Sequence, residues 1–232
     1  GTAKLGDNPL NPIIAISGGN NFSLVLAKDG SVFAFGNNTF GQMGEGSFGS
    51  STSPQRVKKG AYPGINFLGD SINNPIVGIT AGEVHSLALT ANGSIYAFGQ
   101  NVRGQLGNGT LTNSNLPVRV LKGEYAGTSF IGDNSSNPIV SITTGGFFST
   151  AISKNGNVYS FGWNNNGELG DGTNTQRNTP INVKAVDTNS QLNVLSNYFA
   201  PSARTVPANR IIYTSARLNA LVNANGSGAL VS

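Results

Sequence analysis

Apolar and polar residues alternate along this chain in short runs that end at glycine-containing turns. The apolar run from Val84 to Leu89 is followed by Ala91-Asn92-Gly93 and then by a second run from Ser94 to Phe98. Asn-Gly or Asp-Gly between two apolar runs is the strongest short-range signal for a β-hairpin. The pattern therefore predicts two antiparallel strands joined by a tight turn.

The whole pattern occurs three times, at a spacing of 63 residues, with turn glycines at Gly30, Gly93 and Gly156. Each hairpin is preceded by a proline-led β-branched run and followed by a loop with four glycines at fixed offsets. A last short run then begins at Pro54, Pro117 or Pro180. Glycines fixed at the same offsets predict backbone positions with positive φ or close chain approach. Four short strands per unit predict one blade of a β-propeller.

We therefore predict an all-β protein, a single β-propeller segment over residues 1–232 with four-stranded blades. The predicted repeats span residues 13–75, 76–138 and 139–208, the last with a diverged end, and residues 209–232 form a partial fourth repeat. Such a segment cannot close a ring, because its first and last blades would each leave a sheet face and an edge uncovered. The chain is a fragment of a longer propeller, or two copies complete one ring, or units stack into a filament.

Composition narrows the class of protein. Glycine makes up 32 of the 232 residues and charged residues only 10%, against about 25% in average proteins. This polar, charge-poor composition favours a location outside the cell or at its surface, and the Gly1 start favours a processed segment. The net charge is +4 and Lys58-Lys59 is the only adjacent basic pair, so no nucleic-acid partner is expected. No apolar run approaches the ~18 residues of a membrane span.

Residues for catalysis are scarce. The chain has no cysteine, which excludes disulfides and thiolate metal sites, and His85 is its only histidine. His85 and Ser86 are neighbours on one strand, so their side chains point to opposite faces. The equivalent positions hold Phe22 and Phe148, which favours a packed role for His85. We predict no catalytic residue, no cofactor and no metal site.

Two repeated polar features remain as a candidate interaction surface. Aspartates recur after glycine in the linkers, where they close turns or, alternatively, form a ring of carboxylates for a cation or partner. Arginines recur on the last strand of a repeat, where they deter edge-to-edge pairing or dock an acidic partner. The candidate residues are Asp7, Asp70, Asp133, Arg56, Arg119 and His85.

The tandem units resemble the regulator-of-chromosome-condensation repeat family. The best copy runs from Ala81-Gly82 through His85-Ser86-Leu87-Ala88-Leu89 to Gly104-Gln105-Leu106-Gly107, and the resemblance covers roughly residues 13–185 and weakly 209–232. It implies a β-propeller, commonly seven-bladed, used chiefly as a platform for protein partners. Some members are nucleotide-exchange factors for a small GTPase and bind chromatin. No residue of this chain carries over those activities.

We expect a non-enzymatic interaction or structural module, part of an exported surface or multi-subunit assembly, whose partner is a protein or a second copy of the chain. A carbohydrate-binding or glycan-processing propeller is the alternative, supported by loops that carry Asn, Asp and aromatic residues. An exchange factor for a small GTPase is the weaker alternative.

Overall fold

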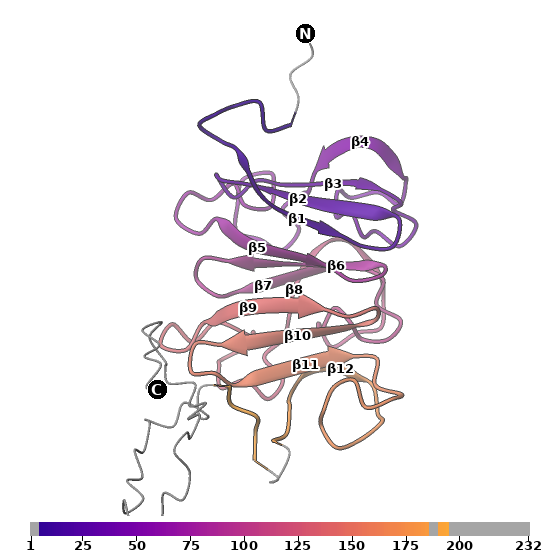
Figure 1. Cartoon of the computed structure of the whole chain (residues 1–232), viewed down its shortest axis with the longest axis vertical. Coiled ribbons are helices and arrows are strands. Elements are labelled where there is room, and N and C mark those ends of the chain that lie inside the picture. Colours follow the sequence, from indigo (N-terminus) through magenta and orange to yellow (C-terminus); the bar gives the residue numbers. More distant parts are fainter. Residues whose placement is uncertain (1–4, 186–189, 195–232) are drawn as a thin grey trace, which may run out of the picture.

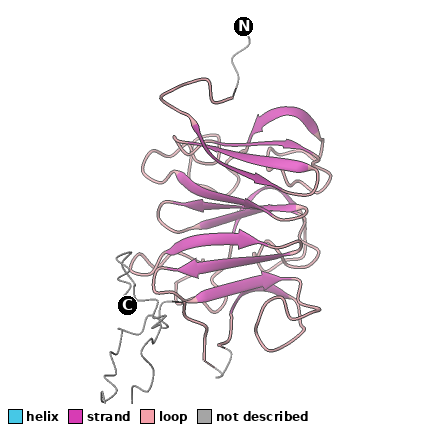
Figure 2. Ribbon diagram, viewed as in Figure 1, coloured by secondary structure: helices cyan, strands magenta, loops and turns pink. Residues whose placement is uncertain are grey.

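The computed structural model describes residues 5–185 and 190–194, and within them the regular elements are twelve strands in three antiparallel sheets (Figures 1 and 2). Each sheet uses four consecutive strands in chain order, and we refer to the sheets as blades 1, 2 and 3. The strands of blade 1 are β1 (Ile13–Gly18), β2 (Phe22–Ala27), β3 (Val32–Gly36) and β4 (Ser51–Arg56). Those of blade 2 are β5 (Ile76–Ala81), β6 (His85–Thr90), β7 (Ile95–Gly99) and β8 (Ser114–Arg119). Those of blade 3 are β9 (Ile139–Thr144), β10 (Phe148–Ser153), β11 (Val158–Gly162) and β12 (Arg177–Asn182).

The predicted propeller blades are confirmed, and so is the hairpin in each of them. The glycines of the β2–β3, β6–β7 and β10–β11 turns have φ angles of 89°, 90° and 88°. A side chain at Gly30 would also lie 2.7 Å from the Pro75 side chain, so both backbone conformation and space require glycine there. The partial fourth repeat predicted at residues 209–232 lies outside the described residues.

The outermost strand of every blade differs from its prediction, which has it begin at Pro54, Pro117 or Pro180. These strands, β4, β8 and β12, begin at Ser51, Ser114 and Arg177 and carry the proline in their interior. The β3–β4 ladder shifts register between Ala34 and Gly36, opposite this part of β4. A proline has no N–H for a ladder, and an irregular stretch of an edge strand does not need one.

Consecutive blades pack face to face (Figure 1). The first strands, β1, β5 and β9, are adjacent, and β4, β8 and β12 lie at the far edges of their sheets. One apolar core lies between blades 1 and 2, where Met43 and Leu24 meet Tyr96 and Phe98. A second core lies between blades 2 and 3, where Leu87 and Leu106 meet Phe161. Each interface therefore buries side chains from two repeats.

Polar contacts at these interfaces repeat as well. The Ser86 hydroxyl donates to the Gln42 carbonyl of the preceding blade at 2.7 Å, and the Ser149 hydroxyl donates to the Gln105 carbonyl at 2.9 Å. Tyrosine rings in the linkers pack edge-on against the next blade, Tyr62 on Tyr96 and Tyr125 on Tyr159, each at 5.5 Å between ring centroids. These contacts fix how each blade is placed on the previous one.

The face of blade 1 that points away from blade 2 is less covered. We call this set of residues the outward face of blade 1: Ile16, Ser23, Phe33 and Phe35. Ile16 is 79% exposed, while its equivalent Ile79 packs against the first core. Phe33 and Phe35 are half-buried, whereas the equivalents Tyr96 and Phe98 are 2% and 0% exposed.

The described part of the chain contains no helix with the length and apolar character of a membrane span.

The inter-blade serine bond gives a test with an internal control. Ser149→Ala leaves the buried Gln105 carbonyl and His85 imidazole without a partner, so we expect the free energy of unfolding to fall by about 1–3 kcal/mol. The equivalent Ser23 has no side-chain hydrogen bond among the described residues, so Ser23→Ala in a dilute solution should change stability by under ~0.5 kcal/mol. Urea unfolding measures both. Equal losses would show that the inter-blade bond contributes nothing.

Candidate functional site

The loops after β3, β7 and β11 are each held by one buried asparagine. Asn38, Asn101 and Asn164 are all 0% exposed. Their side-chain oxygens accept from the backbone N–H of Met43, Leu106 and Leu169, each at 2.9 Å. Their amide N–H groups donate back across the loop, for example from Asn164 to the carbonyls of Thr173 and Thr175 at 3.0 Å. A buried amide with these partners satisfies the backbone of a loop that no sheet supports.

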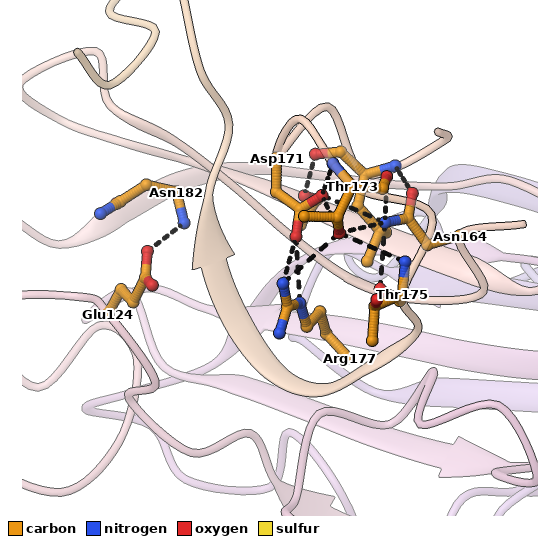
Figure 3. Close-up of polar contacts among 9 residues, drawn as sticks. Glu124, Asn164, Asp171, Thr173, Thr175, Arg177 and Asn182 are labelled. Carbon is orange, nitrogen blue, oxygen red and sulfur yellow. Dashed lines mark hydrogen bonds and ion pairs between the residues drawn. The ribbon is translucent and has the colours of Figure 1, made fainter. Parts of the chain in front are cut away.

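The loop of blade 3 adds charges that are paired within it (Figure 3). Arg177 binds Asp171 at 2.7 Å, and the Thr173 hydroxyl donates to the same carboxylate at 2.7 Å. Burial alone would raise the pKa of Asp171, but the hydrogen bonds from Thr173, Arg177 and Asn164 lower it to about 2. Glu124 of the preceding linker accepts from the Asn182 N–H at 2.8 Å. These groups lie beside a hollow, where Asp171 pairs with Arg177 and Glu124 accepts from a backbone N–H.

The predicted aspartates lie in the linkers and close turns. The Asp70 carboxylate accepts from the N–H groups of Ile65, Asn66 and Phe67 at 2.8–3.0 Å, and Asp133 accepts in the same way from residues 128, 129 and 130. Desolvation opposes ionisation of Asp133, but these hydrogen bonds prevail and lower its pKa to about 2. Asp7 is exposed and precedes β1. A partner-binding role for the three stays a prediction.

The predicted arginines bind their own linkers. Arg56 lies 4.3 Å from the centre of the Phe67 ring, and Arg119 lies 4.0 Å from that of Phe130. The same guanidinium groups donate to the hydroxyls of Ser31 and Ser94 at 2.9 Å and 3.1 Å. In the third repeat Asn182 replaces the arginine, and Gln191, which pairs with Lys184 as Phe67 pairs with Lys58, replaces the phenylalanine. The simultaneous loss of both members indicates that each arginine serves to fasten the linker to the outer strand.

His85 does not lie on a surface, which corrects its place among the candidate interaction residues. It is 0% exposed, and its Nε2 lies 2.9 Å from the Ser149 hydroxyl of blade 3. Because that hydroxyl donates to Gln105, Nε2 must carry the proton, and Nδ1 is left without a partner. Burial lowers the pKa of His85 to about 3, since a proton on Nδ1 would have no acceptor.

Substitution of His85 by the residue of the other two repeats should remove one source of acid sensitivity. Since the folded-state pKa lies below the unfolded value of about 6.5, the unfolded state takes up the proton first, and stability falls as pH drops below ~6.5. The slope reaches up to about 1.4 kcal/mol per pH unit, and Phe at this position has no such proton. We expect His85→Phe to match the wild type at pH 7 within ~1 kcal/mol and to be more stable than it at pH 5.

Urea unfolding of both proteins at pH values from 7 to 4.5 measures this difference. Both proteins carry the same hydrogen-bonded carboxylates, so the loss of stability from these groups at low pH cancels in the comparison and the difference reports the histidine. Parallel stability curves for the two proteins would contradict the assignment.

A hollow of about 400 Å³ opens where blades 2 and 3 meet, at the end of the sheets that carries the loops after β3, β7 and β11. We call its lining the loop corner: Gln100, Val102 and Arg103 from the β7–β8 loop of blade 2, and Phe147 and Trp163 beside β10 and β11 of blade 3. The backbone N–H of Trp163 donates to the Phe147 carbonyl at 2.9 Å, which continues the ladder between those strands. The Arg103 guanidinium carbon lies 3.8 Å from the centre of the Trp163 ring. Arg103 and Trp163 come from different repeats, so no local sequence pattern pairs them.

The residues of the loop corner differ between the repeats, while the loop scaffold stays the same. Between blades 1 and 2 the equivalent positions hold Asn37, Thr39, Phe40, Val84 and Gln100. The aromatic ring is thus on the loop there and on the neighbouring blade at the second junction. Constant asparagines and glycines with variable tips are typical of a scaffold that presents different binding loops.

Comparisons with known proteins agree with the fold. The model of the regulator of chromosome condensation (RCC1) repeat matches residues 29–89, 92–152 and 155–196, and a second model of this repeat matches 13–42, 76–105 and 139–168. The probable E3 ubiquitin-protein ligase HERC6 of Homo sapiens is 34% identical over 176 residues, which is 75% of this chain and 15% of that protein. The RCC2 homolog of Danio rerio is 34% identical over 148 residues, 64% of this chain and 26% of that protein. The chain thus spans about a quarter or less of these relatives.

Solved structures show the same architecture. Prp20p from Saccharomyces cerevisiae, whose structure was reported with its binding properties to Gsp1p and histones, superposes with a TM-score of 0.58 at 25% identity. Human WBSCR16 superposes with a TM-score of 0.57 at 27% identity. The matches cover 76% and 74% of this chain and 39% of each of those chains.

Proposed function

The chain belongs to the regulator of chromosome condensation (RCC1) repeat family, and on this premise we propose that it is a non-catalytic module that binds a protein partner through its loop end. This end comprises the loops after β3, β7 and β11. The observation that carries the proposal is the contrast between a constant loop scaffold and variable loop tips. Phe48 and Leu111, at equivalent tips, are 53% and 48% exposed, so their apolar surface is accessible to a partner at the loop end.

The charged groups support a binding role over catalysis. His85 is buried with its basic nitrogen shielded, and the carboxylates of Asp70, Asp133 and Asp171 are engaged by donors of their own loops. A general acid or base must instead reach its substrate and titrate near the working pH. The ligase named in the HERC6 description belongs to a protein of which this chain spans 15%, so we do not extend that activity to it.

Two finer expectations stay predictions. A location outside the cell or at its surface rests on the charge-poor composition, and a role in an exported assembly rests on that location. A glycan-binding role is less favoured, because Trp163, the chain's single tryptophan, already has Arg103 against its ring. A small-GTPase exchange role has no residue of this chain to support it.

The proposed binding end can be tested by capture of a partner from an extract of the source organism. We expect the double variant Phe48→Ser, Leu111→Ser to retain at least tenfold less partner, because the apolar tips would no longer be buried on binding. The control is Lys28→Ser, Lys154→Ser, at the hairpin turns on the opposite end of the sheets. A partner lost equally with both variants, or retained by both, would contradict the loop end as the binding face.

We also propose that the outward face of blade 1 associates with another blade of this kind, from a second copy or from further chain. The face repeats the residue types that blades 2 and 3 bury on their neighbours, with Ser23 where Ser86 and Ser149 bond across the junction. The equivalent apolar residues of blade 2 are buried against a neighbouring blade, so burial of this face against another blade is expected to be favourable.

Light scattering on a dilution series tests this association. The mass of the chain should rise with concentration, and Ile16→Asp should suppress the rise because it places a charge on that face. Ile72→Asp is the matched control, since Ile72 is 93% exposed and lies in a linker. A constant monomer mass, or identical association of both variants, would overturn the proposal.

A further inference from the structure

The loop corner combines an apolar floor with a cation that no group in the described part of the chain neutralises. Phe147 and Trp163 are half-buried, and Val102 is 47% exposed at the rim of the hollow. Arg103 is exposed, and among the described residues its guanidinium makes the contact with Trp163 but no hydrogen bond or ion pair. Arg56, Arg119 and Arg177, by contrast, all donate to side-chain oxygens.

The contact with the Trp163 ring, 3.8 Å from the Arg103 guanidinium carbon to the ring centre, restricts where the guanidinium can lie. A guanidinium that lies flat on an indole ring keeps its N–H groups in the plane of the fork, where they are free to bind a carboxylate in bidentate geometry. Less side-chain entropy is then lost on binding, because the ring already restricts the arginine. The group is placed for an anion that approaches from solvent over the rim of the hollow.

Nearby acidic groups do not compete for this cation. Glu168 follows Trp163 along the chain, and its two carboxylate oxygens accept from the backbone and side-chain N–H groups of Asn166 at 2.9 Å and 3.0 Å. Desolvation acts against ionisation of Glu168, but these bonds and one from Trp163 hold its pKa below the usual range. Glu83 belongs to the turn before β6, which bonds through its backbone to Asn20 and Gly146. The excess charge of the chain is positive, at +4.

On the basis of the proposed function, we infer that the loop corner binds an acidic peptide segment of the partner protein, in which an aspartate or glutamate adjoins a large apolar residue. The carboxylate binds Arg103, and the apolar side chain enters the hollow against Phe147, Trp163 and Val102. The hollow of about 400 Å³ lies within the range of ~300–1,000 Å³ typical of ligand pockets. The charge of Arg103 thus requires an acidic residue in the peptide, and the apolar lining of the hollow requires a large apolar residue next to it.

Trp163 reports on the site directly, because it is the only tryptophan in the chain. The probe is a short synthetic peptide with Asp-Asp-Leu-Phe-Asp-Asp at its centre, titrated into the full chain while tryptophan fluorescence is recorded. Control peptides replace the aspartates by asparagine or the Leu-Phe pair by Ser-Ser. We expect a saturable change with the first peptide and affinities at least tenfold weaker with both controls.

Three variants separate the site from general charge. Arg103→Gln should weaken binding of the first peptide about tenfold, and Arg103→Lys should restore only part of it because an ammonium cannot form the planar fork. Lys154→Gln, an equal loss of charge at an exposed turn, should bind like the wild type. The thermal unfolding temperature of each variant should match that of the wild type. The Arg103 side chain is exposed, and among the described residues its guanidinium contacts only the Trp163 ring.

Equal binding by wild type and Arg103→Gln, or equal binding of the aspartate and asparagine peptides, would overturn the inference. So would binding of heparin with the same dependence on Arg103 and Lys154, which would indicate charge alone. If Phe48 and Leu111 are needed to capture the partner but Arg103 is not, the binding end stands and the acidic-peptide site falls. If none of the three matters, both proposals fail.

Discussion

A four-stranded sheet has two faces to cover, and in this chain blade 2 covers both of its faces with blades 1 and 3. The requirement explains why the apolar cores lie between sheets and draw residues from two repeats, as Met43 meets Phe98 and Leu106 meets Phe161. Apolar contact alone is tolerant of small shifts between layers. The hydrogen bonds from Ser86 to Gln42 and from Ser149 to Gln105 are less tolerant, since they weaken steeply when the distance or angle leaves the preferred range. The apolar contacts and the serine hydrogen bonds together define how each blade is placed on its neighbour, and this placement also positions the loops at the junction.

Some residues are the same in all three repeats and others differ, and the two sets have different roles in the structure. Asn38, Asn101 and Asn164 do the same work in all three loops, so their constancy follows from the backbone groups that they satisfy. The arginine and phenylalanine that fasten a linker are lost together in the third repeat, as expected for residues that need each other. Positions such as Phe40, Arg103 and Asn166 vary independently of that scaffold. Variation with the framework held constant is our reason for proposing that the binding surface lies at the loop end.

The fold could be predicted from the sequence because its signals are local and repeated. The turn at Asn92-Gly93 and its two copies define the hairpins, and the spacing of 63 residues defines the blade. The site could not be predicted in the same way, because it forms between repeats. His85 faces Ser149, and Arg103 faces Trp163, only once two blades are docked. The candidates chosen from the sequence were the repeated charges, and repetition pointed to structural duties: Asp70 closes a turn and Arg56 fastens a linker.

The two ends of this stack of blades are chemically different. On the face of blade 3 that points away from blade 2, Thr150, Ser160 and Glu168 stand where blade 2 has Leu87, Ala97 and Gln105. The Ser160 hydroxyl donates to the Leu169 carbonyl of its own blade, and the segment at Leu192 bonds to Val158 and Val183. Blade 3 thereby meets part of its hydrogen-bonding needs by itself. Blade 1 instead keeps the apolar residues of an interior repeat on its outward face, with Ile16 79% exposed. Since burial of apolar surface drives association, contact with a further blade is favoured more strongly at the blade 1 end than at the blade 3 end.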